Sequence, residues 1–396
     1  MPPDSHDTRR HWMRRAIHLA MNGRGRVEPN PMVGCVITTP DGRSVLGEGY
    51  HQAFGGLHAE ANALAACVAA GNSPAGATAY TTLEPCCHLN KPTPRCAARL
   101  IEAKVGRVVV GCIDPDPDVN GKGVRLLREA GIDVVTEVLE PECRQLLAPF
   151  IAQTVHRRPY VTLKWAETAD GKVAGPGGRP IRITNDPSDR LVHELRGRCD
   201  AILIGVGTLL TDNPRLTARV PPARHILRKP LRVVLDSRLR GSAESELAKT
   251  ARESPVLIFY NPRRADFGKA AAFRERGVEL FPIESEGPMP LEAVLVELHS
   301  RNVTHVLVEP GPELAVAFLA TPLTDRLWVF RSAYRIDDPT APAAAAIPAG
   351  YVETATMVFP NRVENSLTEY LNPDSHATFA AAPSADFLMS IGRTAG

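Results

Sequence analysis

The sequence contains no long apolar run. Its most hydrophobic stretches, such as residues 201–206, are interrupted within a few residues by glycine or charge, whereas a membrane-spanning helix needs about 20 apolar residues. The first residues are polar and lack the apolar core of a signal peptide. We therefore expect no membrane segment and a cytoplasmic protein.

An excess of charge of one sign is also absent. The 46 basic and 44 acidic residues give a net charge of +2, and no block of Lys and Arg stands out. Proteins that bind nucleic acids usually carry a basic patch or stripe. We therefore expect no nucleic-acid partner, which disfavours an RNA-binding or RNA-editing protein as the alternative function.

Cysteine is too sparse for a disulfide framework. The eight cysteines are spread over 396 residues, whereas disulfide-stabilised domains are short and rich in cysteine. Reduced thiols in a cytoplasmic protein fit this distribution. Four of the eight lie in apolar runs and are expected to be small core residues, namely Cys35, Cys67, Cys112 and Cys199. The length of the chain predicts two domains.

The other cysteines include a group with the spacing of a catalytic zinc site. His-Ala-Glu at 58–60 is followed by Pro-Cys-Cys at 85–87 and then by Cys96. This pattern is typical of zinc deaminases, in which the glutamate transfers protons and is not a ligand. Three protein ligands leave one position for water, whereas a structural zinc, the alternative here, usually has four.

The local structure expected around this group suits that chemistry. His58 and Glu60 open a predicted helix, so one side chain of the first turn can bind metal while the other acts as general acid and base. Cys96 precedes a second helix, whose dipole favours a thiolate. For the remaining ligand we favour Cys86, which follows proline as the signature requires; Cys87 stays an alternative.

Alternating strands and helices predict a three-layer α/β domain over residues 1–150. The expected helices are 8–22, 58–71, 97–104 and 124–130, and the expected strands are 32–38, 44–50, 77–82, 107–111 and 132–138. The loop 114–123 either presents backbone amides and Lys122 to a phosphate or is a solvated turn.

A second α/β domain is predicted over residues 158–345, with a ligand site at its strand ends. The expected strands are 160–166, 201–205, 231–236, 256–260 and 303–309, and the expected helices are 187–198 and a segment ending at 319. Gly-Val-Gly-Thr at 205–208 follows a strand but lacks the third glycine of the dinucleotide fingerprint. Residues 346–396 form an extension of unknown role.

Several runs together resemble one family. PNPMVGCVI, GEGYH, HAE, TLEPCCH and VNGKG in the first half, and RPYVTLKWAETADGK, GVGTLLTDNPRLTAR and VLVEPGPELA in the second, are similar to the bifunctional riboflavin-biosynthesis deaminase/reductases. The resemblance implies a cytidine-deaminase-like three-layer α/β/α domain followed by a dihydrofolate-reductase-like α/β domain. It also implies Zn²⁺ bound by His58, Cys86 and Cys96, with Glu60 as the proton shuttle.

For the second domain, the resemblance implies contacts with NADPH and with a phosphoribosyl-pyrimidine substrate. The positions matched to cofactor contacts are Ala166, Thr208, Asp212, Ser237 and Gly311, and those matched to substrate contacts are Arg196, Leu216, Arg219 and Glu309. Two arginines can clamp a phosphate. The implied reactions are deamination of a diamino-hydroxy-phosphoribosylaminopyrimidine and NADPH reduction of its ribosyl group to ribityl. We expect the enzyme to be a homo-oligomer.

The sequence departs from the family pattern in several places, among them Thr168, Ala169 and Ala333. The spacing from Cys86 to Cys96 is one residue longer than usual, while a count from Cys87 matches it. Arg182 stands in place of an aromatic residue, and Pro310 and Asp337 stand in place of glycines. Since Pro310 removes a backbone donor from the cofactor loop, a deaminase with a non-reducing second domain is the alternative.

Overall fold

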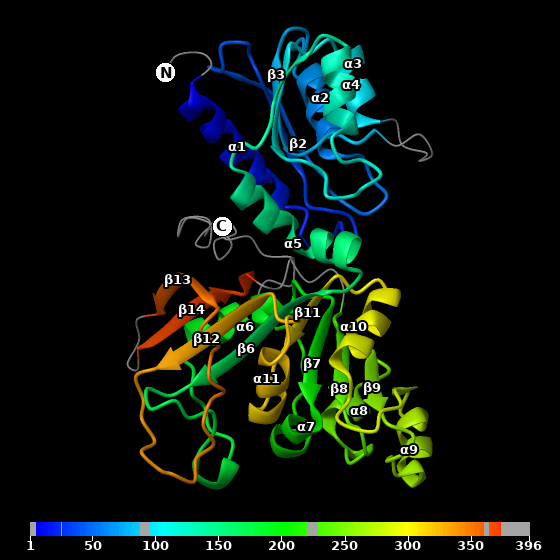
Figure 1. The fold of residues 1–396 in the computed structure, drawn as a ribbon, viewed down its shortest axis with the longest axis vertical. Helices are drawn as coiled ribbons and strands as arrows, with labels where there is room; N and C mark the ends of the chain where they lie inside the picture. Colours follow the sequence, from blue (N-terminus) through cyan, green and yellow to red (C-terminus); the bar gives the residue numbers. More distant parts are fainter. Residues whose placement is uncertain (1–4, 25, 88–94, 220–228, 360–363, 374–396) are drawn as a thin grey trace. The chain divides into compact units, whose positions relative to one another are not determined.

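The computed structural model describes residues 5–24, 26–87, 95–219, 229–359 and 364–373. The chain divides between His156 and Arg157 into two compact units, each built on its own sheet (Figure 1). Within the described ranges, no helix combines the length and the apolar character needed to cross a membrane.

The first unit is a five-stranded sheet in the order β2-β1-β3-β4-β5. β1 is antiparallel to β2 and β3, whereas β3, β4 and β5 are parallel. The strands are β1 (Gly34–Thr38), β2 (Val45–Tyr50), β3 (Thr78–Leu83), β4 (Arg107–Cys112) and β5 (Asp133–Val135), and the helices are α1 (His6–Met21), α2 (Ala59–Ala69), α3 (Cys96–Glu102), α4 (Lys122–Glu129) and α5 (Glu140–His156).

Helices cover both faces of this sheet. α1 and α5 pack together on one face, and α2, α3 and α4 form the layer on the other (Figure 1). The predicted three-layer arrangement is therefore confirmed. Helix α5 was not predicted, and Pro149 in its interior is a residue that normally argues against a helix.

Two glycine positions bring strands directly against helix backbones. A Cβ added to Gly34 of β1 would lie 2.0 Å from the carbonyl oxygen of Ala16 in α1, and one added to Gly49 of β2 would lie 2.3 Å from the amide nitrogen of Ala63 in α2. Only glycine permits such an approach. The contact with β2 fixes the depth of α2, the helix that begins next to His58.

The second unit is a nine-stranded sheet in the order β10-β9-β8-β7-β11-β6-β12-β14-β13. All neighbours from β10 to β12 are parallel, and β14 and β13 are added antiparallel. The strands are β6 (Tyr160–Glu167), β7 (Ala201–Gly205), β8 (Leu231–Leu235), β9 (Val256–Tyr260), β10 (Glu279–Pro282), β11 (His305–Val308), β12 (Arg326–Ser332), β13 (Val352–Phe359) and β14 (Asn365–Leu371).

Helices and short turns connect these strands. The elements are α6 (Asp186–Arg196), α7 (Val206–Asp212), α8 (Glu246–Lys249), α9 (Ala270–Glu275), α10 (Leu291–Ser300) and α11 (Pro312–Leu319), with 3₁₀ turns at Pro176–Gly178 and Phe267–Lys269. Alternate residues of β7 enter two separate apolar clusters: Leu203 packs with α10 and α11, and Ile204 packs with α7, α8 and α9. The sheet is thus buried on both faces, as parallel sheets usually are.

The sheet continues beyond residue 345, where the predicted second domain ends. β14 pairs with β12 from Asn365 to Leu371, and β13 pairs with β14. The extension that had no interpretation from sequence therefore supplies two strands of this sheet. These strands were missed because β14 alternates buried and half-buried residues and β13 has no fully buried residue, so both lack the continuous apolar runs that identify the parallel strands.

Candidate functional site

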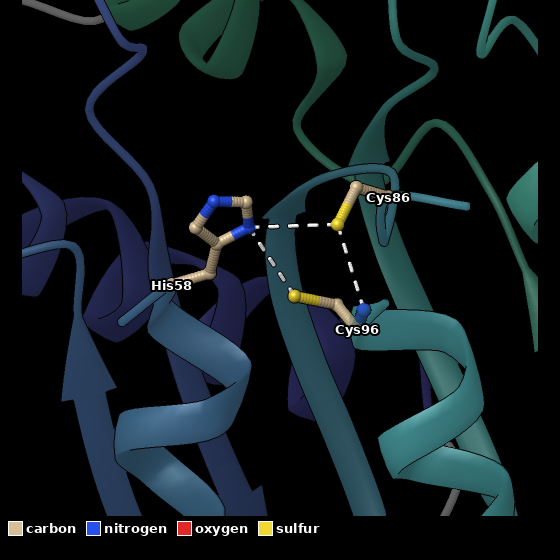
Figure 2. Close-up of side chains that lie close together, drawn as sticks. All are labelled: His58, Cys86 and Cys96. Atoms are coloured by element: carbon tan, nitrogen blue, oxygen red, sulfur yellow. Dashed lines mark hydrogen bonds between the residues drawn. The ribbon is translucent and has the colours of Figure 1, made fainter. Parts of the chain in front are cut away.

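Three side chains in the first unit converge from three separate segments (Figure 2). His58 is the N-cap residue of α2, Cys86 follows β3, and Cys96 is the first residue of α3. The Nδ1 atom of His58 lies 3.5 Å from the Sγ atom of Cys86 and 3.4 Å from that of Cys96. Among the described residues, this is the group of His, Cys, Asp and Glu close enough to hold a metal ion, with its ligand atoms within 4.8 Å of one another.

The surroundings of this group shift the pKa values of Cys86 and Glu60. Hydrogen bonds from the Cys96 thiol and from His58 lower the pKa of the Cys86 thiol to about 4. Glu60, in the first turn of α2, is buried, and burial together with the neighbouring Cys86 raises the pKa of its carboxyl group to about 7. A carboxyl group with such a pKa can both accept and deliver a proton near neutral pH.

Cys87, the alternative ligand in the sequence, is outside this group. Its side chain is buried, and the atoms that lie within 4.8 Å of one another belong to His58, Cys86 and Cys96. Residues 88–94, which include His88 and the extra residue in the spacing between Cys86 and Cys96, lie outside the described residues.

Two polar residues beside the cluster had been overlooked in the sequence. His51 is buried and its ring lies edge-on to that of His58, with centroids 5.4 Å apart. Its Nδ1 atom is 2.9 Å from the carbonyl oxygen of Leu57, and its Nε2 atom is 3.1 Å from Nδ2 of Asn30. Proline flanks Asn30 on both sides, a pattern that from sequence alone indicates no more than a turn.

The loop at 114–123 is not organised as a phosphate site. The backbone N–H groups of Asp114 and Gly121 donate to Glu84, and those of Asp116 and Lys122 donate to Asp114 and Val119. The ammonium group of Lys122 donates to the carbonyl oxygen of Asp118. The interpretation of these amides as free anion donors is therefore wrong, since the chain itself accepts from them.

In the second unit, a buried charge cluster joins three elements. The guanidinium of Arg196, at the end of α6, donates two hydrogen bonds of 2.7 Å to the carboxylate of Glu309, directly after β11. The Nζ atom of Lys164 on β6 lies 3.7 Å from Glu309 Oε2. Burial opposes ionisation of Glu309, but Lys164 and Arg196 outweigh it and lower the pKa of this carboxyl group to about 2.

The other residues expected to bind substrate lie next to this cluster or at its margin. Arg196 also donates to the carbonyl oxygen of Thr217, at 3.4 Å. Leu216 is buried and has a left-handed backbone, with φ of 49°. Arg219 is exposed and contacts His193 of α6. The fork of Arg196, expected to clamp a phosphate, faces Glu309 instead. Lys164 was not among the residues predicted to contact the substrate.

The residues expected to contact the cofactor all follow or end parallel strands. Ala166 lies near the end of β6, Thr208 and Asp212 lie in α7 after β7, Ser237 follows β8, and Gly311 follows β11. Because these four strands are consecutive and parallel, their carboxyl ends share one edge of the sheet. Thr208 and Gly311 are neighbours, since a Cβ added to Gly311 would lie 3.6 Å from Thr208 Oγ1.

Two of the departures from the family pattern, Asp337 and Arg182, make local hydrogen bonds. Asp337 has a left-handed backbone, with φ of 52°, a conformation that glycine favours and aspartate tolerates. Its N–H donates to the Asp170 carboxylate. Arg182 donates a hydrogen bond of 2.7 Å to the carboxylate of Asp189 in the first turn of α6, and this contact fixes its side chain against the start of that helix. Pro310 lies between Glu309 and Gly311, the N-cap of α11.

Replacement of Glu309 by glutamine is expected to destabilise the second unit by about 3–5 kcal/mol, because it leaves the charges of Arg196 and Lys164 buried without their partner. Urea unfolding at pH 7 measures this loss. The matched control is Glu279→Gln, which breaks an exposed double hydrogen bond with Arg301 and should cost about 1 kcal/mol or less.

The same experiment has an expected pH dependence. The pKa of Glu309 is lowered from 4.5 to about 2 in the folded protein, so its contribution is complete above about pH 4.5 and is lost as the pH falls towards 2. The difference between wild type and Glu309→Gln should therefore shrink below pH 4.5. A difference equal to that of the Glu279 control at pH 7 would contradict the assignment of a buried ion cluster.

Comparison with known proteins identifies the family to which the chain belongs. Residues 6–112 match the model of the cytidine and deoxycytidylate deaminase zinc-binding region, and residues 159–333 match that of the RibD C-terminal domain. The chain is 39% identical over 317 residues to the riboflavin biosynthesis protein RibD of Actinobacillus pleuropneumoniae, covering 80% of this chain and 81% of that protein. The chain belongs to the RibD family.

Relatives and solved RibD structures agree with this placement. RibD of Escherichia coli K12 is 37% identical and is matched over 86% of its length. The crystal structure of the diaminohydroxyphosphoribosylaminopyrimidine deaminase/5-amino-6-(5-phosphoribosylamino)uracil reductase of Thermotoga maritima superposes with a TM-score of 0.79 at 33% identity, covering 93% of this chain and 99% of that one. RibD of Acinetobacter baumannii gives a TM-score of 0.77 at 30% identity.

Membership in the RibD family confirms the predicted fold class and function. The chain carries a cytidine-deaminase-like domain followed by the α/β reductase domain of RibD. It is a bifunctional deaminase and reductase of riboflavin biosynthesis, and its deaminase domain is of the zinc-binding kind. The expectation of an enzyme with a small-molecule substrate is confirmed with it.

Proposed function

We propose that the first unit deaminates a diamino-hydroxy-phosphoribosylaminopyrimidine and that the second reduces the ribosyl group of the deaminated product. The observation that carries the first half is the arrangement of two cysteine sulfurs and one imidazole nitrogen within 4.8 Å, next to the buried carboxyl group of Glu60. The solved relative from Thermotoga maritima is described by both of these activities, which supports the substrate assignment.

The donor set fits Zn²⁺. Two thiolates and one imidazole are ligands that zinc favours, and a set of three leaves one position open. His58, Cys86 and Cys96 would hold the ion, which when bound activates water for attack on the amino-bearing ring carbon. Glu60 would take one proton from the attacking water and pass it to the ring nitrogen. It would then take the second proton, from the hydroxyl group that the attack places on the ring carbon, and pass it to the amino group, which leaves as ammonia.

In the second unit, the edge formed by β6, β11, β7 and β8 fits a phosphate-bearing cofactor. The first-turn amides of α7 have no partner within the helix, and Gly207 in this turn has open space where a side chain would lie. NADPH, when bound, supplies the hydride for reduction of the ribose carbon. Thr208, Asp212, Ser237, Ala166 and Gly311 would contact it.

The charge cluster beside that edge would hold the substrate. The Glu309 carboxylate offers acceptors to ribose hydroxyl groups, and Lys164 and Arg196 keep it ionised and fixed in place. Arg219, which is exposed and contacts His193, would bind the phosphate, and Leu216 lies in the same segment. Reaction in the cytoplasm is consistent with the free state of all eight cysteines. We also propose that the protein is a homo-oligomer and that it does not bind nucleic acid.

Two assays on one zinc-loaded preparation test the proposal. Ammonia release from the diamino substrate measures the first reaction, and NADPH oxidation with the deaminated product measures the second. We expect both, with the second lost in Glu309→Gln and the first unaffected by that change. Ammonia release with NADPH oxidation at background would support instead a deaminase whose second domain does not reduce.

A further inference from the structure

Glu84 is a buried carboxylate two residues before Cys86. Only 2% of its surface is exposed, yet it lies in the short segment between β3 and the candidate zinc ligand. Oε2 accepts hydrogen bonds from the N–H groups of Asp114 at 3.1 Å and Gly121 at 2.8 Å, and Oε1 accepts one from Val124 at 3.0 Å. Three backbone donors therefore solvate its charge.

These donors belong to the segment that leads into α4. Gly121 is the N-cap residue of this helix and Val124 lies in its first turn, where amides have no partner within the helix. The N-cap glycine has no side chain that could accept from them. Glu84 supplies that acceptor from a different part of the chain, and its negative charge is favourable at a helix N-terminus.

A second contact presses the same helix turn against the backbone before Cys86. A Cβ added to Gly123 would lie 2.1 Å from the carbonyl oxygen of Pro85 and 3.1 Å from Glu84 Oε1. The first turn of α4 therefore touches Pro85 directly, with no room for a side chain. The segment from Asp114 to Val124 therefore holds both Glu84, by hydrogen bonds, and Pro85, by direct packing. We call this set of contacts the α4 clamp.

Cys86 is held from the other side by α3. Its carbonyl oxygen accepts from the N–H of Ala97 at 3.3 Å, and its Sγ atom accepts from the N–H of Cys96 at 3.5 Å. The cysteine thus lies between the α4 clamp and the start of α3. Its sulfur is directed at His58 Nδ1, as Figure 2 shows, so displacement of the preceding residues would move a ligand atom.

We propose that Glu84 is a positioning residue of the deaminase site, which fixes Cys86 for metal binding through its clamp on the start of α4. The inference rests on the proposed ligand set. Glutamine at position 84 has the same shape but only one acceptor oxygen, and its amide group would face a backbone N–H that also donates. The loop and Pro85 would have to move apart, because buried donors are costly to leave unsatisfied.

The test compares Glu84→Gln with Glu129→Gln, the same change at an exposed position late in α4, in the full-length protein. Zinc affinity is measured by competition with a chromophoric chelator, and site geometry by the visible absorption of the Co²⁺-loaded protein. We expect zinc affinity to fall about 10–100-fold in Glu84→Gln, the range typical of residues that support metal ligands, with altered Co²⁺ bands. The control should match wild type.

Gly123→Ala provides an independent perturbation of the same clamp, and it decides the question if Glu84→Gln does not accumulate in folded form. It should weaken zinc binding in the same direction. A variant that unfolds at lower temperature while its folded form binds zinc like the control would show that Glu84 only stabilises the fold, and would overturn the inference.

Cys86→Ser separates this inference from the ligand assignment. Loss of zinc in Cys86→Ser with wild-type affinity in both clamp variants would overturn the role of Glu84 and leave the ligand set intact. Wild-type zinc affinity in Cys86→Ser as well would overturn the ligand set, and with it the reason to link Glu84 to the metal.

Discussion

Replacement of Glu60 by glutamine should abolish deamination while zinc stays bound. Glutamine keeps the shape of the buried side chain but can neither accept a proton from water nor deliver one to the leaving ammonia. General acid–base catalysis by a positioned side chain is worth about 10²–10⁴-fold in rate, so ammonia release should fall by at least about 100-fold. Zinc content per chain, measured by mass spectrometry, should equal that of wild type.

Two internal controls accompany this variant. NADPH oxidation with the deaminated product should be unchanged, because Glu60 lies in the first unit and the reductase residues lie in the second. Glu129→Gln, at an exposed position of the first unit, should release ammonia at the wild-type rate. Residual deamination above a tenth of wild type in zinc-loaded Glu60→Gln would exclude Glu60 as the proton carrier.

Replacement of Cys86 by serine should remove both zinc and deaminase activity, whereas replacement of Cys87 should remove neither. Cys86 is one of only two sulfur donors facing His58 Nδ1 among the described residues. Loss of a direct ligand should weaken zinc binding by more than about 100-fold, beyond the range for residues that merely support ligands. Zinc content after dialysis against a chelator is the measurement.

Comparison of the two variants separates a lost ligand from a folding defect. The two cysteines are adjacent, and Cys86 is half-buried and Cys87 buried. A fold defect caused by removing a thiol in this segment should appear in both variants, whereas loss of a ligand should appear in one. If Cys87→Ser loses zinc and Cys86→Ser retains it, the family spacing counted from Cys87 is the correct guide and the ligand assignment is wrong.

Much of this molecule was predictable from short stretches of sequence. The class of chemistry follows from a few residues whose types are set by what zinc and proton transfer require, and these residues occupy local motifs at strand and helix ends. Likewise the buried parallel strands of the second unit appear as continuous apolar runs, such as Ala201–Gly205. The zinc-site motifs and the apolar runs can both be identified without knowledge of the fold, because each depends only on residues that are close in sequence.

Features that depend on distant residues could not be predicted in this way. Strands β13 and β14 complete a sheet only through pairing with β12. The fork of Arg196 faces Glu309, 113 positions along the chain, so its availability for a phosphate could not be judged from residue type. The loop at 114–123 has the composition of an anion site, but its amides are taken by a carboxylate that β3 brings to it.

The sequence by itself therefore determined that this is a zinc-type deaminase fused to a reductase, because ligand and proton-transfer chemistry restricts residue types within short motifs. Only the tertiary structure decided which of two adjacent cysteines faces His58. A one-residue difference in spacing can be absorbed by a loop, whereas the direction of a side chain at the end of β3 is set by what packs around it. Here that packing comes from the start of α3 on one side and, through Glu84 and Pro85, from α4 on the other.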